Sequence, residues 1–375
     1  MNILAFVTGL TLMVLVLLDA FETVILPRRV TRRFRLTQAF YRITWRPWIW
    51  ITSFATGKRR DMLLSFFGPL SLLGLLVVWA FGLIVSFALL QWSFALPLNI
   101  GNPSFEIYLY MSGTTFFTLG FGDIVPMSRL GRMLAVLESG TGFGFLALVL
   151  GYLPVLYQAF SRREAHISLL DARAGSPPTA TELLRRESGD NELFGLSQLL
   201  HDWERSSAEL MESHLSYPVL AYFRSQHDNQ NWLAALTAIL DTSAVALLIC
   251  KGHCQQQSRL TFAMARHAVV DLAQVFGAPP RRDNTERLTT EQLTSLLDVL
   301  PKLSSTPIDS ERLQEDLSKL RLMYEPYVIA LAEHLHLSLP PWAPVLEKSD
   351  NWQTSAWGQT STVSLPAAGL EDEHS

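Results

Sequence analysis

Hydrophobic residues along this chain gather in three long runs within residues 1–160. The runs extend over Ile3–Leu26, Met62–Leu90 and Met133–Phe160. About 20 consecutive apolar residues suffice for a helix to cross the hydrocarbon core of a bilayer. The pattern therefore predicts three membrane-spanning helices in the first part of the chain.

From about Ser161 the pattern changes to shorter segments with helical periodicity, separated by proline and glycine. No segment alternates convincingly enough to predict a strand, and Thr179 with Glu182 predicts a capping box at one helix start. The breaks fall at Gly175–Pro178, Pro218, Gly277–Pro280 and Pro307, and the periodic segments are Glu192–Leu215, Trp232–Leu248, Arg259–Phe276, Glu291–Leu300 and Ser310–Leu337.

These patterns together predict an all-α membrane protein followed by an α-helical soluble domain. After Pro340 the chain becomes rich in Pro, Ser, Thr and Gln, which is typical of a disordered tail. The expected division is an N-terminal transmembrane helix (1–27), a basic loop (28–61), a membrane module (62–160), a helical cytoplasmic domain (161–339) and the tail (340–375).

Composition agrees with a chain divided between membrane and water. Hydrophobic residues make up 49% of the chain and charged residues 17%, which is too apolar for an ordinary soluble protein. The net charge of -4 gives no reason to expect nucleic-acid binding. The only cysteines, Cys250 and Cys254, cannot form a disulfide framework and suit a reducing compartment.

Charge around the first apolar run predicts its orientation. Basic residues follow the run without any acidic residue among them, so the positive-inside rule places this loop in the cytoplasm and the N-terminus outside. No basic residue precedes the run, which argues against a signal peptide in favour of a multi-pass protein of a bacterial inner membrane. The loop carries Arg28, Arg29, Arg32, Arg33, Arg35, Arg42, Arg46, Lys58, Arg59 and Arg60.

Arg29, Arg32 and Arg35 recur every third residue, as the arginines of a voltage sensor do. Sensor arginines lie inside an apolar spanning helix, whereas these follow one, so a basic segment facing the lipid headgroups is the favoured interpretation. The aromatic and basic segment Phe40–Phe54 suits a helix lying at the membrane interface.

The segment Thr114–Asp123 has the chemistry of an ion-selective pore lining. Selection of potassium requires backbone carbonyls to replace the ion's hydration shell. Gly120 and Gly122 alternate with Leu119 and Phe121, and glycine adopts left-handed conformations at little cost, so successive carbonyls can point the same way. Thr118 can add a hydroxyl oxygen at the inner mouth.

Both flanks of this segment favour a pore loop over a glycine-rich turn between two helices. Pro103–Met111 predicts a short helix with a polar cap, long enough to re-enter the bilayer but too short to cross it. Gly131 and Arg132 then lead into the third apolar run. The orientation predicted from charge makes this loop enter from outside.

The segment resembles the signature of the potassium-channel family, Thr-x-x-Thr-x-Gly-Tyr/Phe-Gly-Asp. The resemblance covers about residues 62–160 and implies that Thr118, Leu119, Gly120, Phe121, Gly122 and Asp123 form the ion-binding filter. It also implies a homotetramer embedded in membrane lipids, because the family closes its carbonyl rings with four chains. The inner helix of the family has a glycine hinge where Gly142 falls.

Two positions depart from the family pattern. Phe121 replaces the usual Tyr, and Met111 stands where the pore helix of many members has its Trp partner, so an apolar brace between Phe121 and Met111 is expected. Thr114 stands where some bacterial relatives carry Glu. The presence of Thr instead of Glu is expected to loosen the outer filter. Met111, Thr114 and Thr115 are therefore the predicted filter supports.

The third run contains the residues expected to line or gate the pore. Glu138 either attracts cations or senses pH, or else is a hydrogen-bonded carboxyl packed beside Ser139 or Thr141 of a neighbouring helix. The family register makes Phe143, Leu146 and Leu150 face the conduction path, and Pro154 is expected to kink the helix near a cytoplasmic gate.

The remaining sequence offers little further chemistry. Cys250, His253 and Cys254 form a weak candidate metal site, and free thiols beside a helix break are favoured instead. His334 and His336 lie two residues apart, on different faces of a helix. No catalytic constellation and no nucleotide-binding glycine turn is present, so no enzyme activity, no cofactor and no metal other than potassium in the filter are expected.

The sequence therefore predicts passive potassium conduction through a tetramer, gated or assembled through the cytoplasmic helices by an unknown ligand or protein regulator. A weakly selective cation channel is one alternative. A membrane receptor or scaffold with a non-conducting pore is another.

Overall fold

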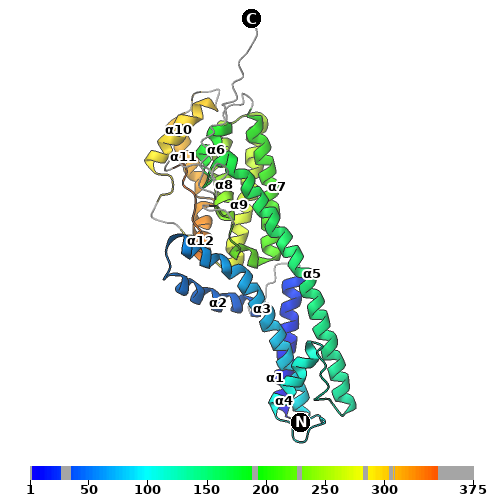
Figure 1. Cartoon of the computed structure of the whole chain (residues 1–375). Helices are drawn as coiled ribbons and strands as arrows, with labels where there is room; N and C mark the ends of the chain where they lie inside the picture. Colours follow the sequence, from blue (N-terminus) through cyan, green and yellow to red (C-terminus); the bar gives the residue numbers. More distant parts are fainter. Residues whose placement is uncertain are drawn as a thin grey trace, which may run out of the picture. The chain divides into compact units, whose positions relative to one another are not determined.

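All regular elements in the part of the chain that is described are helices (Figure 1). The structure, a computed structural model, describes residues 2–26, 35–187, 193–225, 230–281, 286–303, 307 and 309–344. It divides into two compact units, one formed by Met1–Arg162 with Glu212–Arg224 and the other by Arg163–Met211 with Ser225–Ser375. The prediction of an all-α membrane protein with a helical soluble region is confirmed.

Along the chain the elements fall into two groups, which differ from the two compact units because η3 belongs to the first unit. The first contains α1 (Ile3–Ala20), the π-helix η1 (Phe21–Ile25), α2 (Leu36–Thr52), α3 (Gly57–Ser93), α4 (Phe105–Phe116) and α5 (Arg129–Ala174). The second contains α6 (Ala180–Arg186), α7 (Phe194–Ser216), η3 (Pro218–Tyr222), α8 (Trp232–Ile249), α9 (Gly252–Phe276), α10 (Thr290–Val299), η4 (Leu300–Lys302), α11 (Ser310–Arg321) and α12 (Glu325–Leu335).

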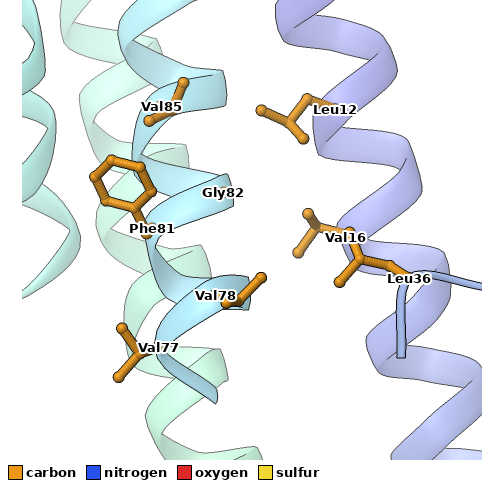
Figure 2. A pocket seen from close by; sticks show the side chains of 8 residues that line it. All are labelled: Leu12, Val16, Leu36, Val77, Val78, Phe81, Gly82 and Val85. Carbon is orange, nitrogen blue, oxygen red and sulfur yellow. The ribbon is translucent and has the colours of Figure 1, made fainter. Parts of the chain in front are cut away.

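In the first unit α1 packs antiparallel along α3 through small residues. A Cβ atom added at Gly9 would lie 3.0 Å from the Leu89 Cβ atom, and one at Gly82 would lie 2.9 Å from a methyl of Val16. Glycine allows helices to approach this closely in a membrane. Around Gly82 the two helices, with Leu36 at the start of α2, border an open apolar pocket of about 330 Å³, whose lining residues are drawn in Figure 2.

A buried carboxylate joins the end of α1 to the start of α2. Asp19 is 3% exposed and accepts hydrogen bonds from the Thr37 amide at 3.1 Å, the Thr37 hydroxyl at 2.6 Å and the Trp79 indole at 2.9 Å. A negative charge at a helix N-terminus also interacts favourably with the helix dipole. Asp19 thereby joins α1, α2 and α3. Of the predicted basic loop, Arg28, Arg29, Arg32 and Arg33 lie outside the described residues.

In the second unit the apolar helix α8 lies inside a bundle and packs against α9, α11 and α6. Four described helices are long and apolar enough to cross a membrane, namely α1 with η1, α3, α5 and α8, but 89% of the apolar window of α8 is buried inside the protein. Hydroxyl groups on α8 bond to carbonyls one turn earlier, as Thr237 does to Leu233 at 2.6 Å. A helix that is apolar all round and covered by protein is a core helix.

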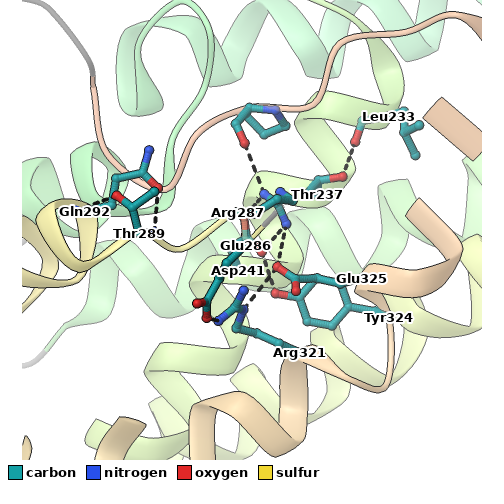
Figure 3. Close-up of polar contacts among 11 residues, drawn as sticks. Leu233, Thr237, Asp241, Glu286, Arg287, Thr289, Gln292, Arg321, Tyr324 and Glu325 are labelled. Carbon is teal, nitrogen blue, oxygen red and sulfur yellow. Dashed lines mark hydrogen bonds and ion pairs between the residues drawn. The ribbon is translucent and has the colours of Figure 1, made fainter. Parts of the chain in front are cut away.

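A charged network lies beside α8 (Figure 3). Arg287 contacts the fully buried Asp241 at 2.7 Å and Glu325 at 3.0 Å, and the Tyr324 hydroxyl donates to Asp241. Although burial disfavours a cation, the Asp241 carboxylate raises the pKa of Arg287 above its usual value, so the guanidinium stays charged. Arg287 also donates to the carbonyl of Pro340 at 3.1 Å, which fixes the chain after α12.

Three helix predictions for the second unit need correction. The expected segment Ser310–Leu337 is two helices, because Pro326 has no amide hydrogen to donate to the carbonyl four residues earlier and instead occupies the first turn of α12. α9 begins at Gly252 rather than Arg259. The Thr179 hydroxyl accepts from the Glu182 amide at 3.3 Å, but the Glu182 side chain bonds to Arg185 and Arg186 rather than completing a capping box.

Candidate conduction pore

The pore loop begins with α4, a 12-residue helix that is too short to cross a bilayer. Ser104 occupies the N-cap position with extended backbone, but its side chain makes no capping bond. The helix continues to Phe116, five residues beyond the predicted end at Met111. Thr114 and Thr115 therefore belong to its last turn.

The backbone after α4 alternates in the way that the glycine pattern predicted. Thr118, Gly120 and Gly122 have φ angles of +54°, +57° and +78°, while the intervening Leu119 and Phe121 are not left-handed. An alternation with a period of two residues turns successive carbonyls toward the same side of the chain. Residues 118–122 are called the strand below, although they belong to no β-sheet. Thr118 adopts this conformation although it has a Cβ atom, so the arrangement is maintained against a local steric cost.

The amide groups of this strand are held by α4, and this leaves its carbonyls available. The Leu119 amide donates to the Thr114 carbonyl at 2.8 Å, and the Thr118 amide donates to the Thr115 carbonyl at 3.0 Å. Among the described residues, the carbonyls of residues 118–122 accept no hydrogen bond. Thr114 and Thr115 thus support the strand through their main chain, while the Thr114 hydroxyl bonds back to Met111 at 2.9 Å.

Two residues that the sequence analysis missed hold the outer end of the strand. The Tyr110 hydroxyl donates to the Asp123 carboxylate at 2.9 Å, and the Asn99 amide group donates to the Asp123 carbonyl at 2.7 Å. Asn99 also accepts from the Val125 amide at 3.0 Å. The sequence did contain a signal for Tyr110, since a phenol on the pore helix can reach the end of the filter signature. The resemblance to the potassium-channel family pointed to the neighbouring Met111 instead.

Met111 does not form the expected brace with Phe121 within the chain. It is 2% exposed and packs in a cluster with Ala88, Leu96, Leu98 and Tyr108, whereas Phe121 is 67% exposed. Met111 therefore anchors α4 to α3 and the outer loop. A contact between Phe121 and Met111 stays a prediction for an assembly of several chains.

Glu138 lies inside the chain, between the pore helix and α3. It is completely buried, accepts a hydrogen bond from the Gln91 amide group of α3 at 3.0 Å and is hydrogen-bonded to the Ser112 hydroxyl of α4. The Ile84 carbonyl, 2.7 Å from the Ser112 hydroxyl oxygen, is an alternative acceptor for the single hydroxyl hydrogen. The contacts agree with the alternative of a hydrogen-bonded carboxyl, but the partners within the chain are Gln91 and Ser112, so the carboxyl joins the pore helix to α3 and α5. A pore-lining role, and a contact with Ser139 or Thr141 of a neighbouring helix, stay predictions for an assembly of several chains.

Gly142 provides close packing between α5 and the end of the pore helix. A Cβ atom at this position would lie 1.9 Å from the Phe116 carbonyl oxygen, so only glycine fits. The family comparison predicted a hinge here. The described contact requires glycine for another reason, because α5 packs directly against Phe116, the last residue of the pore helix.

The other predicted pore-lining residues lie on an uncovered face of α5. Phe143, Leu146 and Leu150 are 68%, 53% and 64% exposed in the single chain. This exposure is compatible with a shared apolar path, and their role there stays a prediction. α5 continues as one helix through Pro154 to Ala174, so the third apolar run and the residues up to the predicted break at Gly175 are a single element.

The weak metal candidate in the second unit is not formed. Both cysteines are free and buried between α8 and α9, and His253 bonds to Ser197 at 2.9 Å. Within the described ranges no three His, Cys, Asp or Glu side chains are grouped as a metal site. His334 lies in α12, where burial lowers its pKa, and His336 is the left-handed residue that ends this helix.

Comparisons with known proteins agree with the position of this site. Residues 73–158 match the family model described as "Ion channel", a segment that includes the end of α3, the pore loop and most of the predicted inner helix. The chain is also 23% identical over 206 residues to the uncharacterized membrane protein YdjJ of Bacillus subtilis (strain 168), a match covering 52% of this chain. It spans 57% of that relative's length. No solved structure matches the chain.

Proposed function

We propose that this protein conducts potassium ions passively and selectively across a membrane. Residues 73–158 form an ion-channel domain in a membrane protein, and the proposal concerns which ion passes and how. The observation that carries it is the alternation of left-handed φ at Thr118, Gly120 and Gly122. Carbonyls stacked in this way can replace the water molecules around a dehydrated ion.

The assembly that this strand requires is a ring of copies. One strand supplies one side of each carbonyl ring, and its side chains Leu119 and Phe121 are 56% and 67% exposed in the single chain. Four copies around an axis would close the rings and cover these side chains. α4 ends immediately before the strand, and the partial negative charge at its C-terminal end favours a cation there.

The side chains that hold the strand in place favour selectivity. Glu138 connects α3, α4 and α5, while Tyr110 and Asn99 fix Asp123 at the outer end. A strand braced at both ends keeps its oxygens at fixed separations. Such a brace favours potassium over a weakly selective cation channel, which remains the alternative within transport.

The orientation follows the predicted charge asymmetry. With the N-terminus outside a bacterial inner membrane, α1 would run inward, α3 outward and α5 inward, and the helical second unit would lie in the cytoplasm as an assembling or regulatory part. The apolar faces of α1, α3 and α5 support this topology, since each has a window suited to a bilayer.

The test is the reversal potential of purified protein in a planar bilayer with potassium on one side and sodium on the other. We expect a value close to the potassium equilibrium potential. Gly120→Ala should abolish the current, because φ of +57° disfavours a residue with a Cβ atom. Gly101→Ala is the matched control, since it lies in the outer loop with open space around its Cβ position.

Other outcomes would contradict the proposal in different ways. A reversal potential near zero would indicate the weakly selective channel. A protein that carries no current in any condition and binds a partner at fixed stoichiometry would indicate a receptor or scaffold.

A further inference from the structure

A short segment from the C-terminal half of the chain is built into the first unit. Glu212–Arg224 groups with Met1–Arg162, although the residues on both sides of it belong to the second unit. Its last part, residues 217–224, contains η3 and is named the aromatic wedge below. The chain enters the wedge from α7 and leaves it toward α8.

One side of the wedge is a stack of rings against α2 and α3. The Tyr222 ring lies parallel to Tyr41, with centroids 5.5 Å apart, and contacts Trp45 at 5.0 Å and Phe67 at 5.3 Å. All four side chains are at most 9% exposed. Offset and edge-to-face aromatic pairs at these distances are favourable and directional.

The other side of the wedge contacts α5 in the last part of the predicted inner-helix segment 133–160. Tyr217 lies 5.5 Å from Tyr152, and Phe223 lies 5.7 Å from Phe160, measured between ring centroids. These two α5 residues are on either side of Pro154, where the helix lacks one backbone donor. The wedge therefore touches α5 where that helix is most easily deformed.

The fit between wedge and α3 is close. A Cβ atom at Gly68 would lie 2.7 Å from the Phe223 ring. Arg224 adds an ion pair to Asp61 at 3.7 Å, which is weak because the Asp61 side chain is 72% exposed. Ring packing and shape, rather than charge, hold the wedge.

We propose that the aromatic wedge is a positioning element for the inner mouth of the pore. It ties α5 near Pro154 to α2 and α3 of the same chain, so that displacement of the wedge through α7 changes how often the pore conducts. The proposal rests on the proposed function. It adds the element through which the cytoplasmic helices would act, and it assigns no role to the filter.

The experiment uses the full-length protein and compares Tyr222→Leu with Trp50→Leu. Leucine keeps an apolar side chain at position 222 but removes the ring stack, whereas Trp50 is 65% exposed on the same helix that carries Tyr41. We expect Tyr222→Leu to shift open probability by about tenfold or more, the effect of about 1.4 kcal/mol. Unitary conductance and reversal potential should stay unchanged.

A double variant tests whether the two stacked rings act together. Tyr41→Leu should shift open probability in the same direction as Tyr222→Leu, and the double variant should shift it no further than the larger single change. Additive shifts would show that the rings act separately, and this result would overturn a shared positioning role.

Hydrogen exchange of residues 152–160 gives a readout independent of current. Tyr222→Leu should speed exchange there, and Trp50→Leu should not. If the wild-type protein conducts no potassium, the proposed function fails, and unchanged exchange in Tyr222→Leu would refute the wedge in either case. Should Tyr222→Leu fail to assemble, Gly68→Ala displaces the Phe223 ring while every aromatic residue is kept, and Gly151→Ala is its control.

Discussion

The most apolar windows of α5 and α8 have nearly the same mean hydropathy but opposite surroundings. Only 11% of the apolar window of α5 is buried inside the chain, compared with 89% for α8. The uncovered face of α5 includes Phe143 and Leu150, whereas α8 is surrounded by α6, α9 and α11. The difference teaches that hydropathy shows only that a helix needs apolar surroundings. Whether other helices of the same chain cover it, or whether it is covered from outside the chain, depends on the tertiary packing.

Each of the two helices carries a buried carboxyl with hydrogen-bond partners from other parts of the chain. Glu138 of α5 is buried against α3 and α4, while the other face of the helix is left apolar. Asp241 of α8 is paired with Arg287 inside the bundle. Each carboxyl is hydrogen-bonded, as burial requires, but the first holds a pore helix and the second holds the core of a bundle.

The largest effect is expected at Gly142, where α5 contacts the end of the pore helix. In Gly142→Ala the new methyl would overlap the Phe116 carbonyl, so α5 must move away from the pore helix and conduction should be lost. Gly140→Ala is the matched control, because its Cβ position has open space within the chain. Single-channel recording of both variants measures the effect, and a Gly142→Ala variant with normal current would refute the described contact.

Removing Asp241 should give the largest loss of stability in the second unit. Asp241→Ala leaves Arg287 buried without its main partner, which costs about 3–5 kcal/mol for a buried pair. Denaturant unfolding of the full chain, with hydrogen exchange of α8 amides, measures the loss. Glu315→Ala removes only an exposed ion pair with Lys319 and should leave stability unchanged. Equal stability of the two variants would argue against the buried network.

Matched truncations on the two helices sharpen the comparison directly. Leu240→Ala in α8 creates a cavity at a fully buried position and should cost about 2–5 kcal/mol. Val136→Ala in α5 removes methyl groups that are 72% exposed in the chain, and we expect about 0.5 kcal/mol or less. The same unfolding measurement compares them. A larger loss for Val136→Ala would show that other copies of the chain cover this face tightly.

Among the fully buried positions the smallest effect is expected at Glu138, and it separates bracing from pore lining. Glu138→Leu leaves Gln91 and Ser112 without their shared partner, at about 1–3 kcal/mol, and should shorten conducting periods. Glu138→Gln can bond to both and should keep the unitary conductance. A fall in conductance in Glu138→Gln would instead show that the carboxyl acts on passing cations.

Much of the fold was predictable because its signals are local. Three apolar runs and the helical breaks require only hydropathy, proline and glycine, and the filter strand requires only the spacing of Gly120 and Gly122. The break between α11 and α12 was missed although Pro326 marks it, because the apolar periodicity on both sides of the break appears continuous. The site was less predictable, since Tyr110, Asn99 and Gln91 reach partners 13, 24 and 47 residues away.

The sequence by itself determined that the chain is helical, that its first part suits a bilayer and that residues 118–122 can stack carbonyls. These properties depend on side-chain polarity and on the conformational freedom of glycine at single positions. Tertiary structure alone decided that Glu138 braces the pore helix, that Gly142 is a packing contact, that α8 is a core helix and that residues 217–224 pack with the first unit. Each of these depends on which distant surfaces meet, and periodicity along one helix does not specify its partner.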